Sequence, residues 1–453
     1  MPIPDKSRIK LAIIGVCAAS AVGGLVFSEL NLTLAALRIH LHATLAQLQW
    51  VLNTYGIIVA STLVLFGRLG DILGRKKIFL IALFLLALSM LITGLAHNIY
   101  TVIAAQVLNG ISSAIVMPVS QAMITTIYGE QRRSKAIGLW AASTGIALGL
   151  GPIYSGFIIH ALSWRWVFLL NVPMLAMSFM MVVLFAFDSR SDEESPRLDW
   201  LGSVVLCIAM ASFVMAIVES QVFSHITVAI LTLISISSFI VLFVIESRVD
   251  QPIIREDLFK NRAFLLASFC NCLLLFFIWA DFFLLPLFLQ NVLGYSPLQA
   301  GAVMLLVTVP LVLFSMKSQF FYERFGPRRL IIIGFLFLIV SSIIQYYFGM
   351  HVSLVMIAIA ALTFGIAWAM IWNPSATKAV STLPLRHAGV SSGTFVTFQE
   401  VGGSMGLAIT GSVVRHFSTL LQGYSRGMIV LCIISIVGLL AALLMQPLRR
   451  STQ

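Results

Sequence analysis

The chain has 453 residues, of which 60% are hydrophobic and only 10% are charged, against about 25% charged residues in an ordinary soluble domain. So little charge excludes two or three soluble domains with polar surfaces, and the long uninterrupted apolar runs exclude the alternating pattern of a membrane β-barrel. The net charge of +11 is typical of basic cytoplasmic loops in a membrane protein, so it does not indicate nucleic-acid binding.

The predicted elements are apolar helices long enough to cross a bilayer, which takes about 20 residues. Four Arg residues out of 28 Lys and Arg fall in outer loops when the N-terminus is placed in the cytoplasm (Arg38, Arg165, Arg415 and Arg426). We therefore predict an all-α membrane protein with fourteen transmembrane helices and both termini cytoplasmic. The stretches are about 11–36, 48–67, 78–97, 101–127, 137–160, 166–187, 200–219, 225–245, 264–287, 298–317, 329–348, 352–376, 389–414 and 427–446.

Two polar segments divide these helices into groups of six, two and six. The segments 188–199 and 246–262 flank the seventh and eighth helices. We expect a six-helix bundle at 1–187, linkers with a two-helix insert at 188–262, and a second six-helix bundle at 263–453.

A weak internal repeat relates the two bundles. GRLGDILGRKK (67–77) follows the second helix, and KSQFFYERFGPRR (317–329) follows the second helix of the second bundle. Each has an acidic residue three positions before a Gly that precedes basic residues. Related halves are typical of secondary transporters, whose substrate site lies between them. In the first copy, Gly67 and Gly70 permit close helix approach, and Asp71 can cap a helix end or pair with a basic residue of the other bundle. Gly74 is the repeated glycine, and Arg75 and Lys76 hold the loop in the cytoplasm.

The fifth helix carries a stripe of small residues with a proline, STGIALGLGPIYSGF (143–157). Such a stripe lets a neighbouring helix pack closely. Its members are Gly145, Gly149, Gly151, Pro152 and Gly156.

These motifs resemble those of a known family. The 67–77 segment resembles the loop signature between helices two and three of the major facilitator superfamily, and the stripe resembles that family's antiporter signature. The helix count is similar to that of the fourteen-helix branch of drug:proton antiporters, as are QWVLNTYGI (49–57), LPLFLQNVLGYSPLQAG (285–301) and FQEVGGSMGLAITG (398–411). The resemblance implies the family's fold, a bacterial inner-membrane location, multidrug-type efflux coupled to protons, and a conformational latch at 67–77.

Four positions depart from that branch. Ser155 stands where a second Gly is usual in the stripe, and Gln106 and Asn109 stand where the fourth helix usually has Arg and Gln. Glu29 replaces the usual Asp of the first helix. Loss of the Arg removes the residue to which the resemblance would assign proton relay.

Three acidic residues lie deep inside predicted helices: Glu29, Asp281 and Glu400. An ionisable side chain inside a membrane is costly and is a functional hypothesis by default. Glu29 and Asp281 lie at similar depth in the first helices of the two bundles, so we expect pseudo-symmetric mates flanking a central cavity. We predict that all three handle protons or cations; the alternative is a hydrogen-bonded structural role.

Other polar and aromatic residues within the spans are candidates for the substrate cavity, although each one singly is more often helix-packing. Together with three carboxyls they suit a bulky, amphipathic, cationic or zwitterionic solute. They are Asn31, Asn53, Tyr55, Gln106, Asn109, Asn271, Gln345, Trp368, Trp372, Asn373 and Gln399.

The favoured function is therefore export of a small solute in exchange for protons. No metal-ligand set, nucleophile–base group or GxxxxGK[ST] loop occurs in the sequence, so we expect no enzyme activity, no metal, no cofactor and no ATP. The expected partners are the solute, protons and lipid, and a periplasmic adaptor is left open. The alternatives are a proton-independent or importing permease, favoured by the missing Arg, and a non-transporting receptor with the same fold.

Overall fold

The computed structural model describes residues 6–128, 133–187, 200–220, 222–246, 261–381 and 388–445. This part of the chain is helical and holds no strand. The helices are α1 (Lys6–His40), α2 (Leu45–Leu73), α3 (Arg75–Gly94), α4 (Ile99–Tyr128), α5 (Arg133–Ala161), α6 (Trp164–Leu169), α7 (Asn171–Phe185), α8 (Trp200–Val218), α9 (His225–Glu246), α11 (Arg262–Asn291), α12 (Pro297–Met316), α13 (Ser318–Phe325), α14 (Pro327–Tyr346), α15 (Leu354–Ser381), α16 (Ala388–Arg415) and α17 (Leu420–Leu443).

Local sequence signals mark several helix ends. Thr44 caps α2 with a capping box, in which its hydroxyl accepts from the Gln47 amide and the Gln47 side chain accepts from the Thr44 amide. Asn261 caps α11 by accepting from the amides of Ala263 and Phe264. Such side chains satisfy amides that the first helical turn leaves free, so each helix begins at a defined residue.

Twelve of the described helical segments are long and apolar enough to cross a membrane. This confirms the multi-pass, all-helical character predicted from composition. The segment predicted at 166–187 is two helices, α6 and α7, joined at Leu170. Helices α2 and α16 are not among the twelve, so the count of fourteen stays a prediction.

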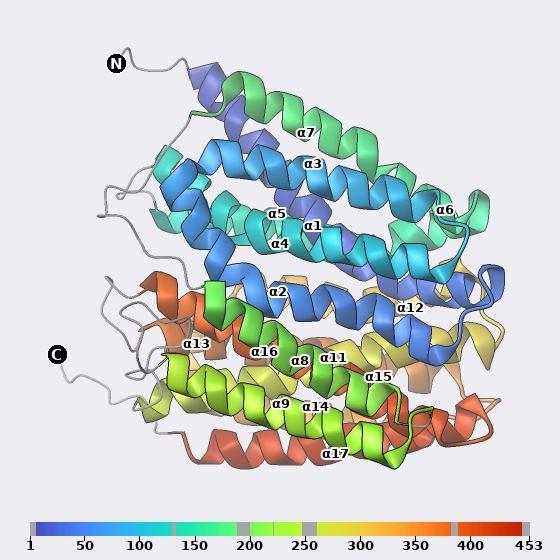
Figure 1. Ribbon diagram of the computed structural model, residues 1–453. Coiled ribbons are helices and arrows are strands. Elements are labelled where there is room, and N and C mark those ends of the chain that lie inside the picture. Colours follow the sequence, from blue (N-terminus) through green and yellow to red (C-terminus); the bar gives the residue numbers. More distant parts are fainter. Residues whose placement is uncertain are drawn as a thin grey trace.

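The helices run side by side, so the connections between them lie on two opposite faces of the molecule (Figure 1). We call one the basic face: it holds the α2–α3 and α13–α14 connections, with Arg75, Lys76, Arg328 and Arg329. The other, called the opposite face, holds the α1–α2 and α8–α9 connections. Helices α1–α7 pack mainly with one another, as do α11–α17. The two groups meet chiefly where α5 packs on α12 and α2 packs on α16.

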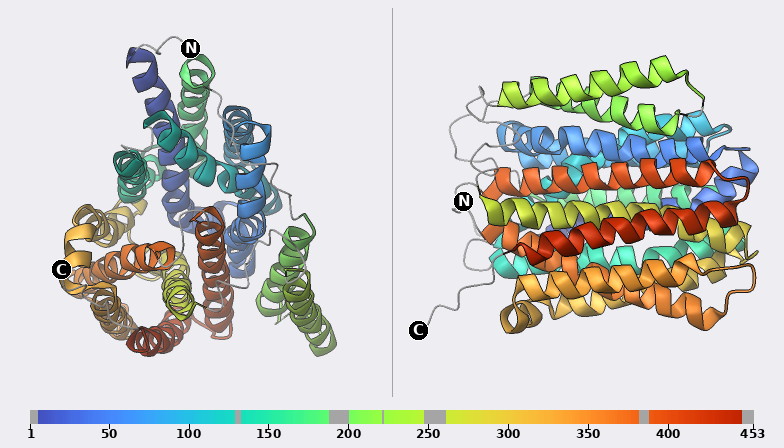
Figure 2. Two further views of the ribbon diagram at one scale, coloured as in Figure 1. Left: turned by 90° about the vertical axis from the view of Figure 1, so that its left-hand side faces the viewer. Right: turned by 90° about the horizontal axis from the view of Figure 1, so that it is seen from below.

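The α8–α9 pair lies at the edge of the assembly (Figure 2). Helix α9 packs on α8 and leaves a large apolar surface, including Ile226, Ile230 and Leu233, each more than half exposed. A surface of this composition suits lipid, where helix exteriors are apolar. The predicted division at 1–187, 188–262 and 263–453 remains a prediction about domains.

Candidate functional site

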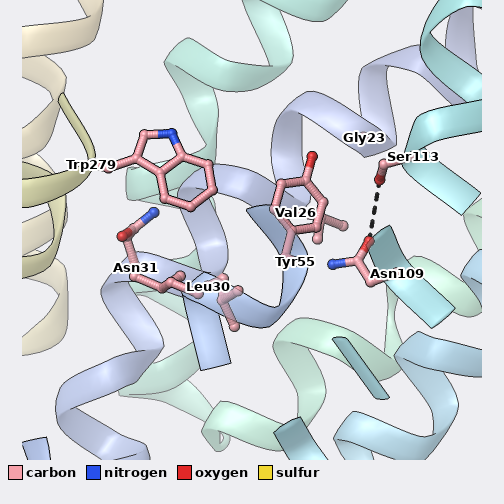
Figure 3. A pocket seen from close by; sticks show the side chains of 9 residues that line it. Gly23, Val26, Leu30, Asn31, Tyr55, Asn109, Ser113 and Trp279 are labelled. Atoms are coloured by element: carbon pink, nitrogen blue, oxygen red, sulfur yellow. Dashed lines mark hydrogen bonds between the residues drawn. The ribbon is translucent and has the colours of Figure 1, made fainter. Parts of the chain in front are cut away.

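A small cavity of about 20 Å³ lies where the two helix groups meet. Its lining comes from α1, α2, α4 and α11, and Figure 3 shows these side chains converging from both groups. The lining residues are Gly23, Val26, Leu30, Asn31, Leu52, Tyr55, Asn109, Ser113 and Trp279. A mostly apolar hollow with a few convergent polar groups is the usual form of a small-molecule site. Three residues predicted for the cavity, Asn31, Tyr55 and Asn109, are therefore brought together.

Two aromatic rings of the cavity lining lie next to each other. The centroids of Tyr55 on α2 and Trp279 on α11 are 6.1 Å apart with an interplanar angle of 30°. The Trp279 indole is wedged between two glycines: a Cβ built on Gly56 would lie 2.7 Å from its Cη2, and one on Gly403 would lie 2.7 Å from its Cδ2. Trp279 thus joins α2 to α11 and α16 at the cavity wall.

In α4, Gln106 stands where the resembled branch has Arg, and it forms a neutral pair with Asn109. The Asn109 side-chain amide donates to Gln106 Oε1 at 2.9 Å, and the Ser113 hydroxyl donates to Asn109 Oδ1 at 3.4 Å. Gln106 is fully buried, and its Nε2 has no hydrogen-bond partner within the described chain. The fourth helix therefore offers amide dipoles to the cavity instead of a fixed cation.

A second set of hydrogen-bonded polar side chains lies within the α11–α17 half. Gln399 Nε2 donates to Asn271 Oδ1 at 2.7 Å, and Asn271 Nδ2 donates to Ser375 Oγ at 2.6 Å. Trp368 stacks on Phe364 with centroids 6.0 Å apart. These candidates, with Trp372 and Asn373 on the same helix α15 as Trp368, are not among the cavity-lining residues.

Asn53 is another candidate that the cavity lining does not include. It lies on α2 and is fully buried. Neither of its side-chain polar atoms has a hydrogen-bond partner in the described part of the chain.

The Glu29 carboxyl is fully buried and faces its own helix group. The Asn171 side-chain amide, at the start of α7, donates to Glu29 Oε2 at 2.7 Å. Oε1 has no hydrogen-bond partner among the described residues. Tyr154 of α5 is close enough to interact electrostatically. Glu29 therefore points toward α7 and α5, and it does not line the cavity.

Asp281 repeats this arrangement in the second group. Its carboxyl is fully buried beside Gln345 of α14 and Tyr424 of α17, and the Tyr424 hydroxyl donates to Gln345 Oε1. Gln345 lies close enough to interact with the Asp281 carboxyl, although neither carboxyl oxygen meets full hydrogen-bond geometry within the described chain. Each carboxyl lies on the first helix of its group and faces the last one. We expected both to flank the central cavity; the structure places them at matching positions inside the two groups.

Glu400, on α16, lies close to Tyr55 of the cavity lining. It is 8% exposed, its Oε2 has no described hydrogen-bond partner, and it interacts electrostatically with Tyr55. A carboxyl beside a cavity aromatic can attract a cation held against that ring.

The glycine stripe of α5 packs mainly against the other helix group. Thr308 Oγ1 of α12 donates to the Gly149 carbonyl at 3.0 Å, and a Cβ on Gly156 would lie 2.7 Å from the Pro297 carbonyl oxygen. The Pro152 carbonyl touches the Gly301 backbone closely enough to exclude a Cβ there. In addition, Gly151 packs on Ser28 of α1, whereas a Cβ on Gly145 would meet nothing within 4 Å.

The repeated loop signature forms the same turn in both halves. Gly74 separates α2 from α3 with φ 102°, and Gly326 separates α13 from α14 with φ 74°. This positive-φ region favours glycine because a Cβ would clash with the backbone. The side chain of Asp71, predicted to take part in the latch, lies outside the described residues.

The basic residues of the first turn tie it to neighbouring helices. Arg75 Nη1 donates to Thr126 Oγ1 of α4 at 2.8 Å, and Lys76 Nζ donates to the carbonyls of Val183 and Ala186, each at 2.8 Å. On α2, a Cβ on Gly70 would lie 2.9 Å from Val119 Cγ2, and one on Gly67 would lie 3.6 Å from Pro118.

Comparison with known protein families shows to which family the chain belongs. The model of the Major Facilitator Superfamily matches residues 12–407. The chain belongs to the Major Facilitator Superfamily. It is accordingly a multi-pass membrane transporter and not an enzyme.

Relatives in the superfamily include resistance proteins. Methylenomycin A resistance protein of Streptomyces coelicolor is 27% identical over 454 residues, covering 96% of this chain and 94% of that protein. Multidrug resistance protein Stp of Mycobacterium tuberculosis is 27% identical over 370 residues, covering 81% and 68%. Among solved structures, a bacterial homologue of the human lysosomal transporter Spinster, inward-facing and unoccupied, aligns with a TM-score of 0.69 at 14% identity, covering 97% of this chain and 98% of that one. That likeness concerns the fold alone.

Sequence reasoning missed Trp279 in this superfamily member. An aromatic in the middle of an apolar run is usually a packing residue, so nothing marked it. The available signal was spacing: Trp279 is two residues from Asp281, or about 200° around the helix. If one of the pair faces its own bundle, the other faces the partner bundle.

Proposed function

We propose that this transporter exports a small amphipathic solute, cationic or zwitterionic, across the bacterial inner membrane in exchange for protons, by alternating access. The observation that carries the proposal is the cavity between the helix groups, where Tyr55 and Trp279 lie next to each other. Glu400 lies next to Tyr55. Aromatic faces attract organic cations by about 0.5–2 kcal/mol, more when water is excluded. The resemblance to drug-resistance proteins supports efflux of such a solute.

The orientation proposed here places the basic face in the cytoplasm. Arg75, Lys76, Arg328 and Arg329 lie there, and basic loops stay on the cytoplasmic side of bacterial membranes. We include α2 and α16 among the spans, because they run beside the twelve apolar ones. That gives fourteen spans as six, two and six, with both termini cytoplasmic.

Proton coupling is proposed to rest on the three membrane carboxyls. Glu400 is the group that a cationic solute can reach, so solute and proton compete for it directly. Glu29 and Asp281 lie inside the two bundles, where a change of packing during rocking alters their exposure to water. The 67–77 turn would set the conformational equilibrium, and the α5 stripe would set how closely the bundles pack.

The second candidate is a proton-independent or importing permease. Its specific support is the neutral Gln106–Asn109 pair in the fourth helix. A transporter that lacks the fixed cation has lost one means of coupling substrate to protons. It would still bind an amphipathic solute in the same cavity.

The test uses purified protein in proteoliposomes with an imposed pH gradient and a lumenal pH dye. Tetraphenylphosphonium and ethidium serve as probe solutes, and protein-free liposomes and a protonophore serve as controls. Proton movement triggered by a probe, and lost in Glu400→Gln, Glu29→Gln or Asp281→Asn, supports antiport and names the coupling group. Probe flux without proton movement favours the permease.

A further inference from the structure

The inserted α8–α9 pair lies against the line along which the two bundles meet. Helix α8 packs on α2 of the first bundle and on α16 of the second, while α9 packs mainly on α8. Ser235 Oγ of α9 donates to the Ala209 carbonyl of α8 at 3.0 Å, which joins the pair into one unit. Figure 2 shows the pair on the outside of the assembly.

An apolar stripe on α8 fills the groove between α2 and α16. Its members recur at every fourth position, Leu206, Met210, Val214 and Val218, and all are buried. They form a separate cluster with Ile57 of α2 and Ala408 of α16. Residues four apart share one helix face, so a single face of α8 contacts both bundles.

We call the line along which the two bundles meet the seam. The α8 stripe covers the half of the seam that lies nearest the opposite face. Ile57 is about twelve residues from the start of α2, or about 18 Å at 1.5 Å per residue. Trp50, nearer the opposite face, packs against the same cluster. Beneath the stripe, Gln49 Nε2 of α2 donates to the Leu407 carbonyl of α16 at 2.8 Å.

Polar bonds from both bundles converge on the end of α8. The Trp50 indole N–H of α2 donates to Glu219 Oε1 at 2.9 Å, with Glu219 being the residue that follows α8. The Arg415 guanidinium of α16 donates to the Val218 carbonyl, and it lies close enough to Glu219 to interact electrostatically. Two adjacent residues of the insert are thus bonded to different bundles.

We propose that the end of α8 is a clamp, formed by Val218 and Glu219 with Trp50 and Arg415, that holds the bundles together at the opposite face. Opening of that face must separate α2 from α16, so at least one side of the clamp must break. The insert therefore biases the transporter toward the conformation closed at the opposite face. This inference uses alternating access from the proposed function and is independent of proton coupling and of the solute.

The other bonds between the bundles agree with a conformation closed there. Within the described chain, hydrogen bonds between α1–α7 and α11–α17 join Gln49 to Leu407, Gln290 to Leu32, Thr308 to Gly149 and Thr397 to Ala60. The first two lie toward the opposite face and the other two near mid-helix. The clamp is the place where a third element reinforces this closure.

The test measures the conformational equilibrium directly, without solute or pH gradient. Spin labels on cysteines at His97 and His351 report the opposite face, and labels at Lys77 and Lys317 report the basic face; all four residues are exposed. The protein is full-length in lipid nanodiscs, with its five native cysteines replaced. Electron-resonance distance distributions are compared among the parent, Glu219→Gln, Arg415→Gln and Trp50→Phe.

We expect each clamp variant to populate a longer distance at the opposite face and a shorter one at the basic face. Hydrogen bonds that involve charged groups are strong enough for a change in population ratio on the order of tenfold. The matched control is Ser235→Ala, which removes a hydrogen bond within the insert and leaves the clamp intact; its distributions should equal those of the parent. Glu219→Asp should restore part of the parent distribution.

Unchanged distributions in Glu219→Gln and Arg415→Gln would overturn the clamp, as would an equal shift in Ser235→Ala. Because Trp50→Phe keeps the aromatic packing and loses only the N–H donor, it separates the hydrogen bond from simple loss of contact. Failure of transport in proteoliposomes with a normal clamp response would contradict the proposed function and leave this inference standing.

Discussion

Gly56→Ala tests whether Trp279 is wedged between the bundles. The new Cβ would lie 2.5 Å from Ser404 Oγ and 2.7 Å from the Trp279 ring, and Gly403 blocks the indole on its other side. Overpacking of this kind costs about 1–3 kcal/mol. The clash lies where α2 contacts α11 and α16. The conformation described here is therefore disfavoured by about 5-fold to about 150-fold relative to one in which the bundles separate.

The assay is the same distance measurement at both faces, with the same two label pairs. Gly145→Ala is the matched control, because a Cβ there would meet nothing within 4 Å. Replacing Trp279 by Phe in the Gly56→Ala background should recover most of the parent distribution, since the smaller ring leaves room for the Cβ. An unchanged distribution in Gly56→Ala, or an equal change in Gly145→Ala, would refute the wedge.

Four further predictions concern the cavity, the contact between α5 and α12, and the turn at Gly74. Glu400→Gln should abolish proton movement triggered by tetraphenylphosphonium and weaken binding of that cation about tenfold, measured in the lumenal-pH assay and by equilibrium binding. Trp279→Ala should weaken binding of the same probe about fivefold through loss of about 1 kcal/mol of cation–π attraction. Gly301→Ala should lower the free energy of unfolding by about 3 kcal/mol, since the Pro152 backbone cannot move aside. Gly145→Ala should leave the free energy of unfolding unchanged. Gly74→Ala should cost about 1–2 kcal/mol, because its φ of 102° is unfavourable for a residue with a Cβ, and a thermal unfolding midpoint equal to that of the parent would contradict it.

Hydropathy was sufficient to predict the helices because a membrane span is long compared with the error of its ends. The run at 264–287, for example, corresponds to α11 at Arg262–Asn291. Two features were missed because they are too short for hydropathy to detect. The break at Leu170 between α6 and α7 and the eight-residue helix α13 are both shorter than the apolar window that identifies a span.

The repeated turn could be predicted because glycine at a fixed place carries conformational information. Gly74 and Gly326 stand at corresponding positions of the two motifs, and both have positive φ. The clamp could not be predicted in this way. Trp50, Glu219 and Arg415 are far apart in the sequence, and each one alone reads as an ordinary residue at a membrane interface.

Sequence position predicts the depth of a membrane residue but not the direction in which it points. Depth follows from the count along a helix, at about 1.5 Å per residue, and on that count Glu29 and Asp281 are expected at similar heights. Direction depends on which neighbouring helices pack on each side. Once the direction of one side chain is known, the directions of its neighbours on the same helix follow, because successive side chains are about 100° apart around the helix axis. Asn31 lines the cavity, so Glu29, two residues away, must face α7; Trp279 lines the cavity, so Asp281 must face α17. The two halves are alike in this respect: each first helix turns one side chain, Asn31 or Trp279, to the central cavity and, about 200° away, one carboxyl to its own bundle.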